Sequence, residues 1–151
     1  MRTLSVMHVV SNLEIGGAQE VVRTLADFMA RHGCVSVVCS FDAGPLRAES
    51  ERLGIPVEVI PERRHSVIAL PLFIFDLLRM RRSLAALVRK YDVDVIQTHL
   101  LRSMDFLVLS LHTRTGPAVF WTFHNALFDL RRDHLTRHKW LLRPKRAIHH
   151  L

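Results

Sequence analysis

Short apolar runs alternate with segments of helical period along this sequence, and that alternation restricts the fold more than any other feature. The apolar runs are Leu4–Val10, Val35–Ser40, Ile55–Ile60, Val93–His99 and Ala118–His124. Each is short and largely apolar, as is typical of strands buried on both faces. Strands that alternate with helices form a parallel sheet covered by helices on both sides. The expected fold class is therefore α/β, with a Rossmann-like parallel sheet.

The intervening segments carry the apolar spacing of amphipathic helices. A first helix is expected from Ala18 and should end at Gly33, a residue suited to a C-terminal cap. The segment 69–91 is predicted to be a long helix with one continuous apolar stripe. The stripe consists of Phe73, Leu77, Met80, Leu84 and Leu87. Shorter helices are expected over 46–53 and 103–113, and a basic helix from Asp133 onward.

Composition and charge limit the class of protein. The 151 residues are 49% hydrophobic and 23% charged, which fits one globular domain and excludes a disordered chain. Residues 1–60 carry five Lys/Arg and seven Asp/Glu, whereas residues 61–151 carry sixteen and seven. Such asymmetry suggests a polyanionic partner: nucleic acid, an anionic membrane or phosphorylated substrates. The alternative is a solvated basic helix face.

Targeting and redox signals favour a cytoplasmic protein that can touch a membrane surface. The longest uninterrupted apolar run, Val67–Phe75, has nine residues, whereas a membrane-spanning helix needs about 20. No secretory signal is recognised at the N-terminus. Cys34 and Cys39 are predicted on opposite faces of one strand, about 16 Å apart, too far for a disulfide.

Ligands of such sheets bind beyond the carboxyl ends of the strands. There, Gly16-Gly17 separates the first strand from the first helix. Two glycines allow close approach to the backbone, and a helix N-terminus offers free N–H groups to a phosphate. The pattern is neither a dinucleotide fingerprint nor a P-loop, and a plain turn is the alternative.

Two histidines, His99 and His124, each end a predicted strand and should face the same crevice. Histidine can bind sugar hydroxyls or phosphate and can transfer protons. His134 and His138 have metal-ligand spacing but no third ligand nearby, so no metal site is predicted. No pair of carboxylates stands at the carboxyl ends of the strands, because Asp92 and Asp94 flank the start of one, which disfavours simple hydrolysis.

The segment HVVSNLEIGGAQEVVRTLADFMARHG resembles the opening of a glycosyltransferase family 4 enzyme. LGIPVEVIP, DVDVIQTHL and VFWTFHN then follow in the order of the family. The family comprises retaining transferases of the GT-B architecture, in which two Rossmann-like domains face a cleft. Gln19 stands where many members have Glu, a difference that we expect to be minor.

The resemblance implies roles for individual residues. Gly16 and Gly17 fall on the glycine pair near the donor diphosphate, and His124 falls near the reaction centre as the catalytic residue. His99 and Asn125 fall on the acceptor side. The family needs no metal and no cofactor; its donor is a UDP- or GDP-linked sugar.

The resemblance also implies a domain assignment. Residues 1–151 are expected to form an incomplete N-terminal, acceptor-side domain that lacks its last strand, with the C-terminal nucleotide-sugar domain absent. The implied function is transfer of a hexosyl group, with retention, to a sugar or lipid-linked acceptor in cell-envelope or exopolysaccharide synthesis. The fragment alone should be inactive. The alternatives are a non-catalytic Rossmann-like module that binds a nucleotide or a partner and, ranked last, a nucleic-acid binder.

Overall fold

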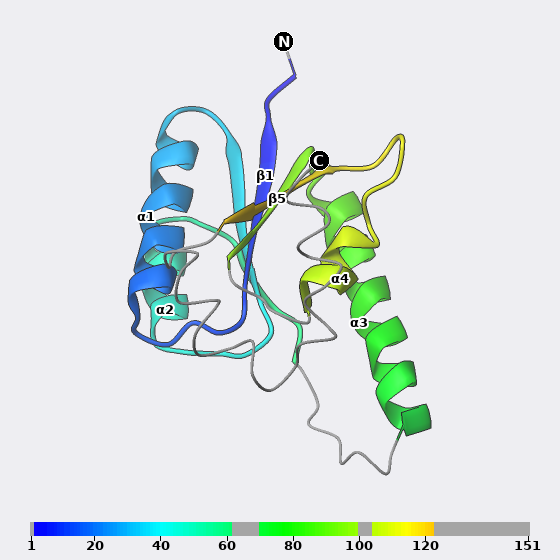
Figure 1. Ribbon diagram of the computed structural model, residues 1–151. Helices are drawn as coiled ribbons and strands as arrows, with labels where there is room; N and C mark the ends of the chain where they lie inside the picture. Colours follow the sequence, from blue (N-terminus) through cyan, green and yellow to red (C-terminus); the bar gives the residue numbers. More distant parts are fainter. Residues whose placement is uncertain (1, 62–69, 100–103, 123–151) are drawn as a thin grey trace, which may run out of the picture.

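The computed structural model describes residues 2–61, 70–99 and 104–122, in which strands and helices alternate (Figure 1). The elements are β1 (Ser5–Val10), α1 (Gly17–Arg31), β2 (Val35–Ser40), α2 (Leu46–Arg52), β3 (Val57–Val59), α3 (Leu70–Lys90), β4 (Val95–His99), α4 (Met104–Leu109) and β5 (Ala118–Thr122). The predicted alternation is therefore confirmed. The basic helix expected from Asp133 lies outside the described residues.

The strands form one parallel sheet in the order β3-β2-β1-β4-β5. β1 lies at the centre, and its last residue, Val10, pairs with Ser40 of β2 and with His99 of β4. The carboxyl ends of the three central strands therefore stop at the same level. This common end is called the carboxyl edge below.

β3 is shorter than the predicted strand over 55–60. Pro56 has no N–H to donate to a ladder, although its carbonyl accepts from the Val38 N–H at 3.0 Å. The Ile55 N–H instead donates to the Ser50 carbonyl at the end of α2, at 3.1 Å. Regular pairing consequently begins only at Val57.

Helices α1 and α2 cover one face of the sheet, and α3 and α4 cover the other (Figure 1). The core on the α1 side consists of Val10, Leu13, Val22, Ala26, Val38, Leu46 and Ile55. The core on the α3 side includes Met7, Val9, Cys39, Met80, Leu84, Ile96 and Val108. All six residues of β1 are buried, because helices pack on both of its faces.

Two sequence predictions about local structure are confirmed. Gly33, at φ +82°, follows the C-cap of α1, and the Cys34 N–H returns to the Met29 carbonyl at 3.1 Å, the geometry of a Schellman cap. Cys34 and Cys39 are both free thiols, as predicted, although Cys34 precedes β2 and does not lie in the strand with Cys39. The described helices include none that is long and apolar enough to cross a membrane.

The apolar stripe of α3 is buried over only part of its length. Met80 and Leu84 are buried in the core, whereas Phe73 near the start of the helix is 43% exposed. The beginning of α3 projects past the sheet, at the lower right of Figure 1. Periodicity gave the correct phase of the stripe, but the supporting sheet ends before the helix does.

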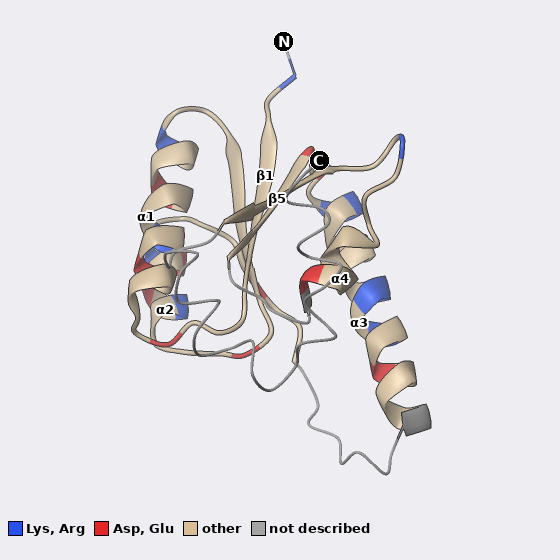
Figure 2. Ribbon diagram, in the orientation of Figure 1, with Lys and Arg blue, Asp and Glu red and all other residues tan. Residues whose placement is uncertain are grey.

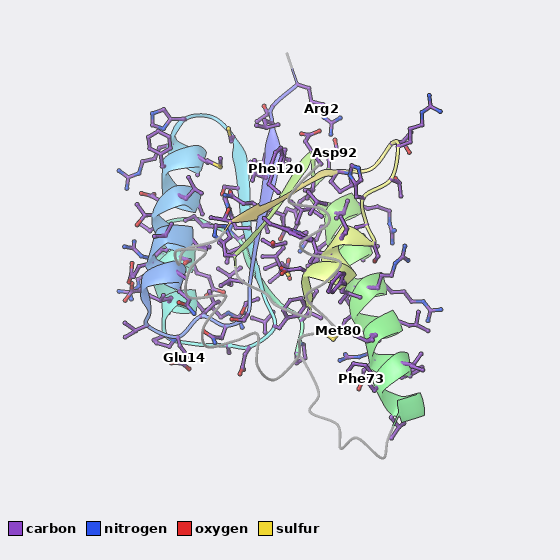
Figure 3. All side chains as sticks on the ribbon, in the orientation of Figure 1. Arg2, Glu14, Phe73, Met80, Asp92 and Phe120 are labelled. Atoms are coloured by element: carbon purple, nitrogen blue, oxygen red, sulfur yellow. The ribbon has the colours of Figure 1, made fainter. Side chains whose placement is uncertain are left out.

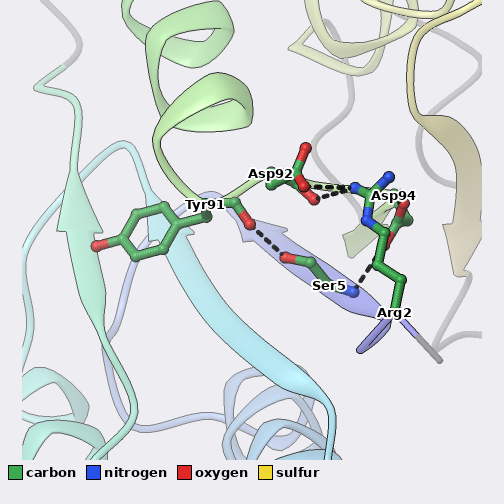
Figure 4. A network of polar contacts seen from close by, with 5 residues as sticks. All are labelled: Arg2, Ser5, Tyr91, Asp92 and Asp94. Carbon is green, nitrogen blue, oxygen red and sulfur yellow. Dashed lines mark hydrogen bonds and ion pairs between the residues drawn. The ribbon is translucent and has the colours of Figure 1, made fainter.

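A polar network joins β1 to β4 at the opposite, amino edge of the sheet (Figure 4). The Ser5 N–H donates to Asp94 Oδ2 at 2.9 Å, and the Ser5 hydroxyl donates to the Tyr91 carbonyl at 2.8 Å. Arg2 forms ion pairs with Asp92 at 2.8 Å and with Asp94 at 3.1 Å. Asp92 and Asp94 therefore have a structural role at the amino edge, opposite the carboxyl edge, as their positions before β4 in the sequence suggested.

This network predicts unequal effects of its two aspartates on stability. Asp94→Ala leaves the buried Ser5 N–H without its acceptor and should lower the free energy of unfolding by about 1–3 kcal/mol. Asp92→Asn is the matched control: Asp92 is exposed at φ +48°, which asparagine adopts readily, so a change within about 0.5 kcal/mol is expected. Urea unfolding measures both, and equal losses would contradict the assignment.

Candidate functional site

The glycine pair lies where β1 gives way to α1, at the carboxyl edge. Gly16 is the N-cap of α1, with extended backbone at φ −167°, and no side chain caps this helix end. Gly17 is the first helical residue and is exposed, and a Cβ added to it would meet nothing within 4 Å. The backbone dihedral angles of Gly16 and Gly17 could be adopted by other residues, so they do not by themselves require glycine. Gly17 therefore faces open space and the N–H groups of the first turn have no side-chain cap, which suits an anion, whereas a Cβ added to Gly16 would meet Gln19 Oε1 at 2.7 Å.

The loop that precedes these glycines is held by one amide side chain. Asn12 Oδ1 accepts from the Glu14 N–H at 3.2 Å and from Gln19 Nε2 at 2.8 Å. The Gln19 amide thus ties the first turn of α1 back to the end of β1. A glutamate in place of Gln19 could not donate this hydrogen bond. Gln19, whose difference from the family we expected to be minor, has a structural role.

A second glycine, Gly44 in the loop after β2, supports the same loop. A Cβ on Gly44 would lie 2.2 Å from the carbonyl carbon of Leu13 and 2.6 Å from the Glu14 nitrogen. The Leu46 N–H also donates to the Leu13 carbonyl at 3.1 Å. The backbone of the loop after β2 therefore packs directly on the backbone of the loop between β1 and α1, residues 11–16, which we call the glycine loop. Gly44 permits this contact because it has no Cβ.

His99 ends β4, as predicted, but its ring is buried, with a relative exposure of 1%. It faces the α1 side of the sheet together with His8, and the two ring centroids are 5.7 Å apart at an interplanar angle of 45°. His8 was missed by the sequence analysis because a single histidine inside an apolar strand gives no signal. The role of His99 toward an acceptor stays a prediction.

His8 is a titratable group inside the sheet. It is fully buried, and neither ring nitrogen has a hydrogen-bond partner among the described residues. Burial without an opposite charge disfavours the protonated imidazole and lowers the pKa of His8 to about 4. The ring is therefore neutral near pH 7.

The same face continues as a polar strip onto β5. Gln97 pairs with Phe120 and His99 with Thr122, and Gln97 Nε2 donates to Thr122 Oγ1 at 2.7 Å. Phe120 is 58% exposed, and Figure 3 labels it on this outer strand. Side chains that can hydrogen-bond thus extend from β1 across β4 to β5 on one face.

The structure brings Gly16, Gly17 and His99 to one edge, since β1 and β4 are paired and end together. His124 and Asn125, predicted beside them, lie outside the described residues, as do His134 and His138. Within residues 2–61, 70–99 and 104–122, no three His, Cys, Asp or Glu residues gather in a way that could hold a metal ion. The described part of the edge thus combines a helix N-terminus that no side chain caps with the Asn12 and Gln19 amides and the His99 ring.

Gly44→Ala should distort the glycine loop. The added methyl overlaps the Leu13 backbone, so we expect a loss of about 1–3 kcal/mol in unfolding free energy and shifts in the NMR signals of residues 12–19. Gly17→Ala is the matched control, because its methyl enters open space and should stabilise the chain by about 0.4–1 kcal/mol. A Gly44→Ala protein as stable as wild type would contradict the proposed contact.

His8 should make the chain less stable in mild acid. The unfolded chain protonates His8 at the ordinary value of 6.5 and the folded chain only near 4, so stability is complete above the first value and falls as the pH drops toward the second. Between about pH 7.5 and about pH 5, His8 should cost about 2 kcal/mol. Urea unfolding of His8→Leu should show a pH dependence weaker by that amount, and an unchanged dependence would contradict it.

Comparisons with known proteins agree with this geometry. A search of curated proteins finds no match. A glycosyltransferase from Rickettsia africae ESF-5 aligns in structure with a TM-score of 0.59 and 18% identity, over 94% of this chain and 35% of that one. MurG of Acinetobacter baumannii aligns with a TM-score of 0.59 and 17% identity, over 82% of this chain and 35% of that one.

At these identities the two structures show a shared fold, and the chain spans about a third of their length. The decisive match is to a family model. The model for Glycosyltransferase Family 4 covers residues 15–150, from the glycine loop through every later element of the fold. The chain therefore belongs to glycosyltransferase family 4.

Proposed function

We propose that this chain is the acceptor-side part of a retaining glycosyltransferase that moves a hexosyl group from a UDP- or GDP-linked sugar to a sugar or lipid-linked acceptor. The product would belong to cell-envelope or exopolysaccharide glycans. The observation that carries the proposal is the open N-terminus of α1 at Gly17 in a chain of this family. A donor diphosphate fits there, because backbone N–H groups and the helix dipole both favour an anion.

Different residues along the carboxyl edge would bind the donor, line the acceptor side and stand at the reaction centre. Gly16 and Gly17 admit the diphosphate to the backbone, and Gln19 fixes the loop that presents them. His99 and Asn125 would line the acceptor side, and His124 would stand at the reaction centre. No metal ion and no cofactor is assigned a role, because the helix N-terminus supplies the positive potential on which a diphosphate depends.

The same proposal places the protein at the inner face of the cell membrane as a peripheral enzyme. Helix α3 supports this with five basic residues, Arg79, Arg81, Arg82, Arg89 and Lys90, of which Arg79 pairs with Asp76 and Lys90 pairs with Glu58. Each Lys or Arg near an anionic leaflet adds about 1 kcal/mol of attraction. A lipid-linked acceptor would be presented at that surface.

Diphosphate binding can be tested directly on the chain. Titration of residues 1–151 with UDP, GDP and inorganic pyrophosphate should shift the amide NMR signals of residues 16–20, weakly because under this proposal these residues supply only one side of the donor site. Gly17→Ala should weaken binding by about tenfold or more, since its methyl occupies the space before the helix. Thr24→Ala, on the exposed face of the same helix, is the control and should bind as wild type does.

Binding unchanged by Gly17→Ala would contradict the site. Incubation with nucleotide sugars and lipid-linked acceptors separates the proposal from a non-catalytic binding module. An acceptor-side domain should bind the acceptor glycan without transferring sugar, whereas a nucleotide-binding module should ignore the glycan. Sugar transfer by residues 1–151 alone would contradict the division of the reaction between two domains.

A further inference from the structure

The side chain of Gln19 has a fixed orientation in the first turn of α1. Asn12 Oδ1 accepts a hydrogen bond from the backbone N–H of Glu14 at 3.2 Å, so this atom is the carbonyl oxygen of the asparagine amide. The atom of Gln19 that lies 2.8 Å from it must then be a donor, the amide nitrogen Nε2. The other end of the Gln19 amide, the acceptor Oε1, therefore points away from Asn12.

Gln19 Oε1 lies against the N-cap of α1. A Cβ built on Gly16 would be 2.7 Å from this oxygen, closer than real Cβ contacts allow, so the two groups are direct neighbours. Gly16 is the N-cap, Gln19 is the third helical residue, and no side chain caps this end of the helix. The charge of the side chain at position 19 therefore acts at short range on the N–H groups of the first turn.

Acidic residues are already present around this end of α1, as the red segments at the lower left of Figure 2 show. Glu20 is paired with Arg23, with Glu20 Oε2 2.9 Å from Arg23 Nε. Glu14 is exposed in the glycine loop, and Figure 3 shows it near the start of the helix. A carboxylate at position 19 would add one more negative charge, directly beside the N-cap, whereas the amide of Gln19 adds none.

A carboxylate in the first turn and an anionic ligand compete for the same positive potential. The N-terminus of a helix carries about half an elementary positive charge, and an acidic side chain in the first turn satisfies it from within the protein. A bound diphosphate would meet that carboxylate as a like charge at close range, and the repulsion grows with the charge of the ligand. A neutral amide at this place leaves the positive potential to the ligand.

We propose that Gln19 is a specificity-determining residue of the donor site, whose uncharged amide, oriented by Asn12, makes the first turn of α1 accept a fully ionised diphosphate. This inference rests on the donor-diphosphate role proposed above for Gly16 and Gly17. It gives Gln19 an electrostatic role in addition to its hydrogen bond to the glycine loop. The two roles are separable, because only the electrostatic one depends on the salt concentration.

The test is NMR titration of residues 1–151 with inorganic pyrophosphate, UDP and GDP at two salt concentrations, about 0.1 M and about 1 M. At the lower concentration Gln19→Glu should bind each ligand about tenfold more weakly than wild type, and at the higher one within about twofold, because salt screens the added charge. Gln19→Met removes the hydrogen bond to Asn12 without adding charge, so its loss of affinity should be the same at both salt concentrations.

Ala30→Glu is the matched control for charge. Ala30 is exposed in the last turn of α1, about 20 Å along the helix from Gly17, so the same added charge lies about two Debye lengths from the site at the lower salt concentration. This variant should bind as wild type does. Urea unfolding should show Gln19→Glu at least as stable as Gln19→Met, because a carboxylate in the first turn interacts favourably with the helix dipole. A loss of binding without a loss of stability separates the electrostatic role from a structural one.

The outcomes separate this inference from the function on which it rests. If wild type binds none of the three ligands, the donor-diphosphate role fails and this inference fails with it. If wild type and Gln19→Glu bind pyrophosphate equally at the lower salt concentration, the donor role stands and the electrostatic role of Gln19 is overturned. If Gln19→Glu and Gln19→Met lose the same affinity at both salt concentrations, Gln19 acts only through Asn12, which also overturns the inference.

Discussion

The central position of β1 determines where everything else in this fold lies. β1 is hydrogen-bonded to β2 on one side and to β4 on the other, and helices cover both of its faces, so all six of its residues are buried. At the amino edge, Ser5 is fixed to Asp94 and to the Tyr91 carbonyl. A slip of β1 against β4 would break those bonds and exchange the two apolar faces. The observed register places Val10 opposite Ser40 and His99 and thereby aligns the strand ends at the carboxyl edge.

The two edges of the sheet have accordingly separate roles. Charged side chains that stabilise the register gather at the amino edge, whereas the described carboxyl edge carries the glycine pair, the Asn12 and Gln19 amides and His99, with Glu14, Asp42 and Asp105 in the segments that follow the strands. His8 illustrates the energetic cost of burying a polar side chain inside the sheet. A buried ring without a hydrogen-bond partner among the described residues contributes less to stability than an aliphatic residue there, and it can remain only because burial keeps it uncharged. A protonated ring at this place would oppose folding.

The elements were predictable from sequence, because local period and glycine placement determine them: β2 spans the predicted residues, and Gly33 caps α1 as expected. The contacts that shape the site were not. Gly44 matters because of the Leu13 backbone, about 30 residues away, and His8 because a ring on another strand lies 5.7 Å from it. No local sequence pattern around Gly44 or His8 predicts these contacts. For α3, periodicity indicates which way Phe73 points but not where the sheet beneath it ends.

Parallel topology also explains why two different surfaces occur at one edge. Every helix that follows a strand begins at the carboxyl ends, so α1 and α3 both start there. Their sequences make these starts chemically opposite. Gly17 faces open space at the start of α1, which suits an anion, whereas exposed leucine, isoleucine and phenylalanine side chains lie on the first turns of α3. The proposed transfer of a sugar from a charged, water-soluble donor to a lipid-linked acceptor would need both environments at one edge of the sheet. A parallel α/β sheet supplies that adjacency without any added domain, because the chain must return to the same edge to begin each helix.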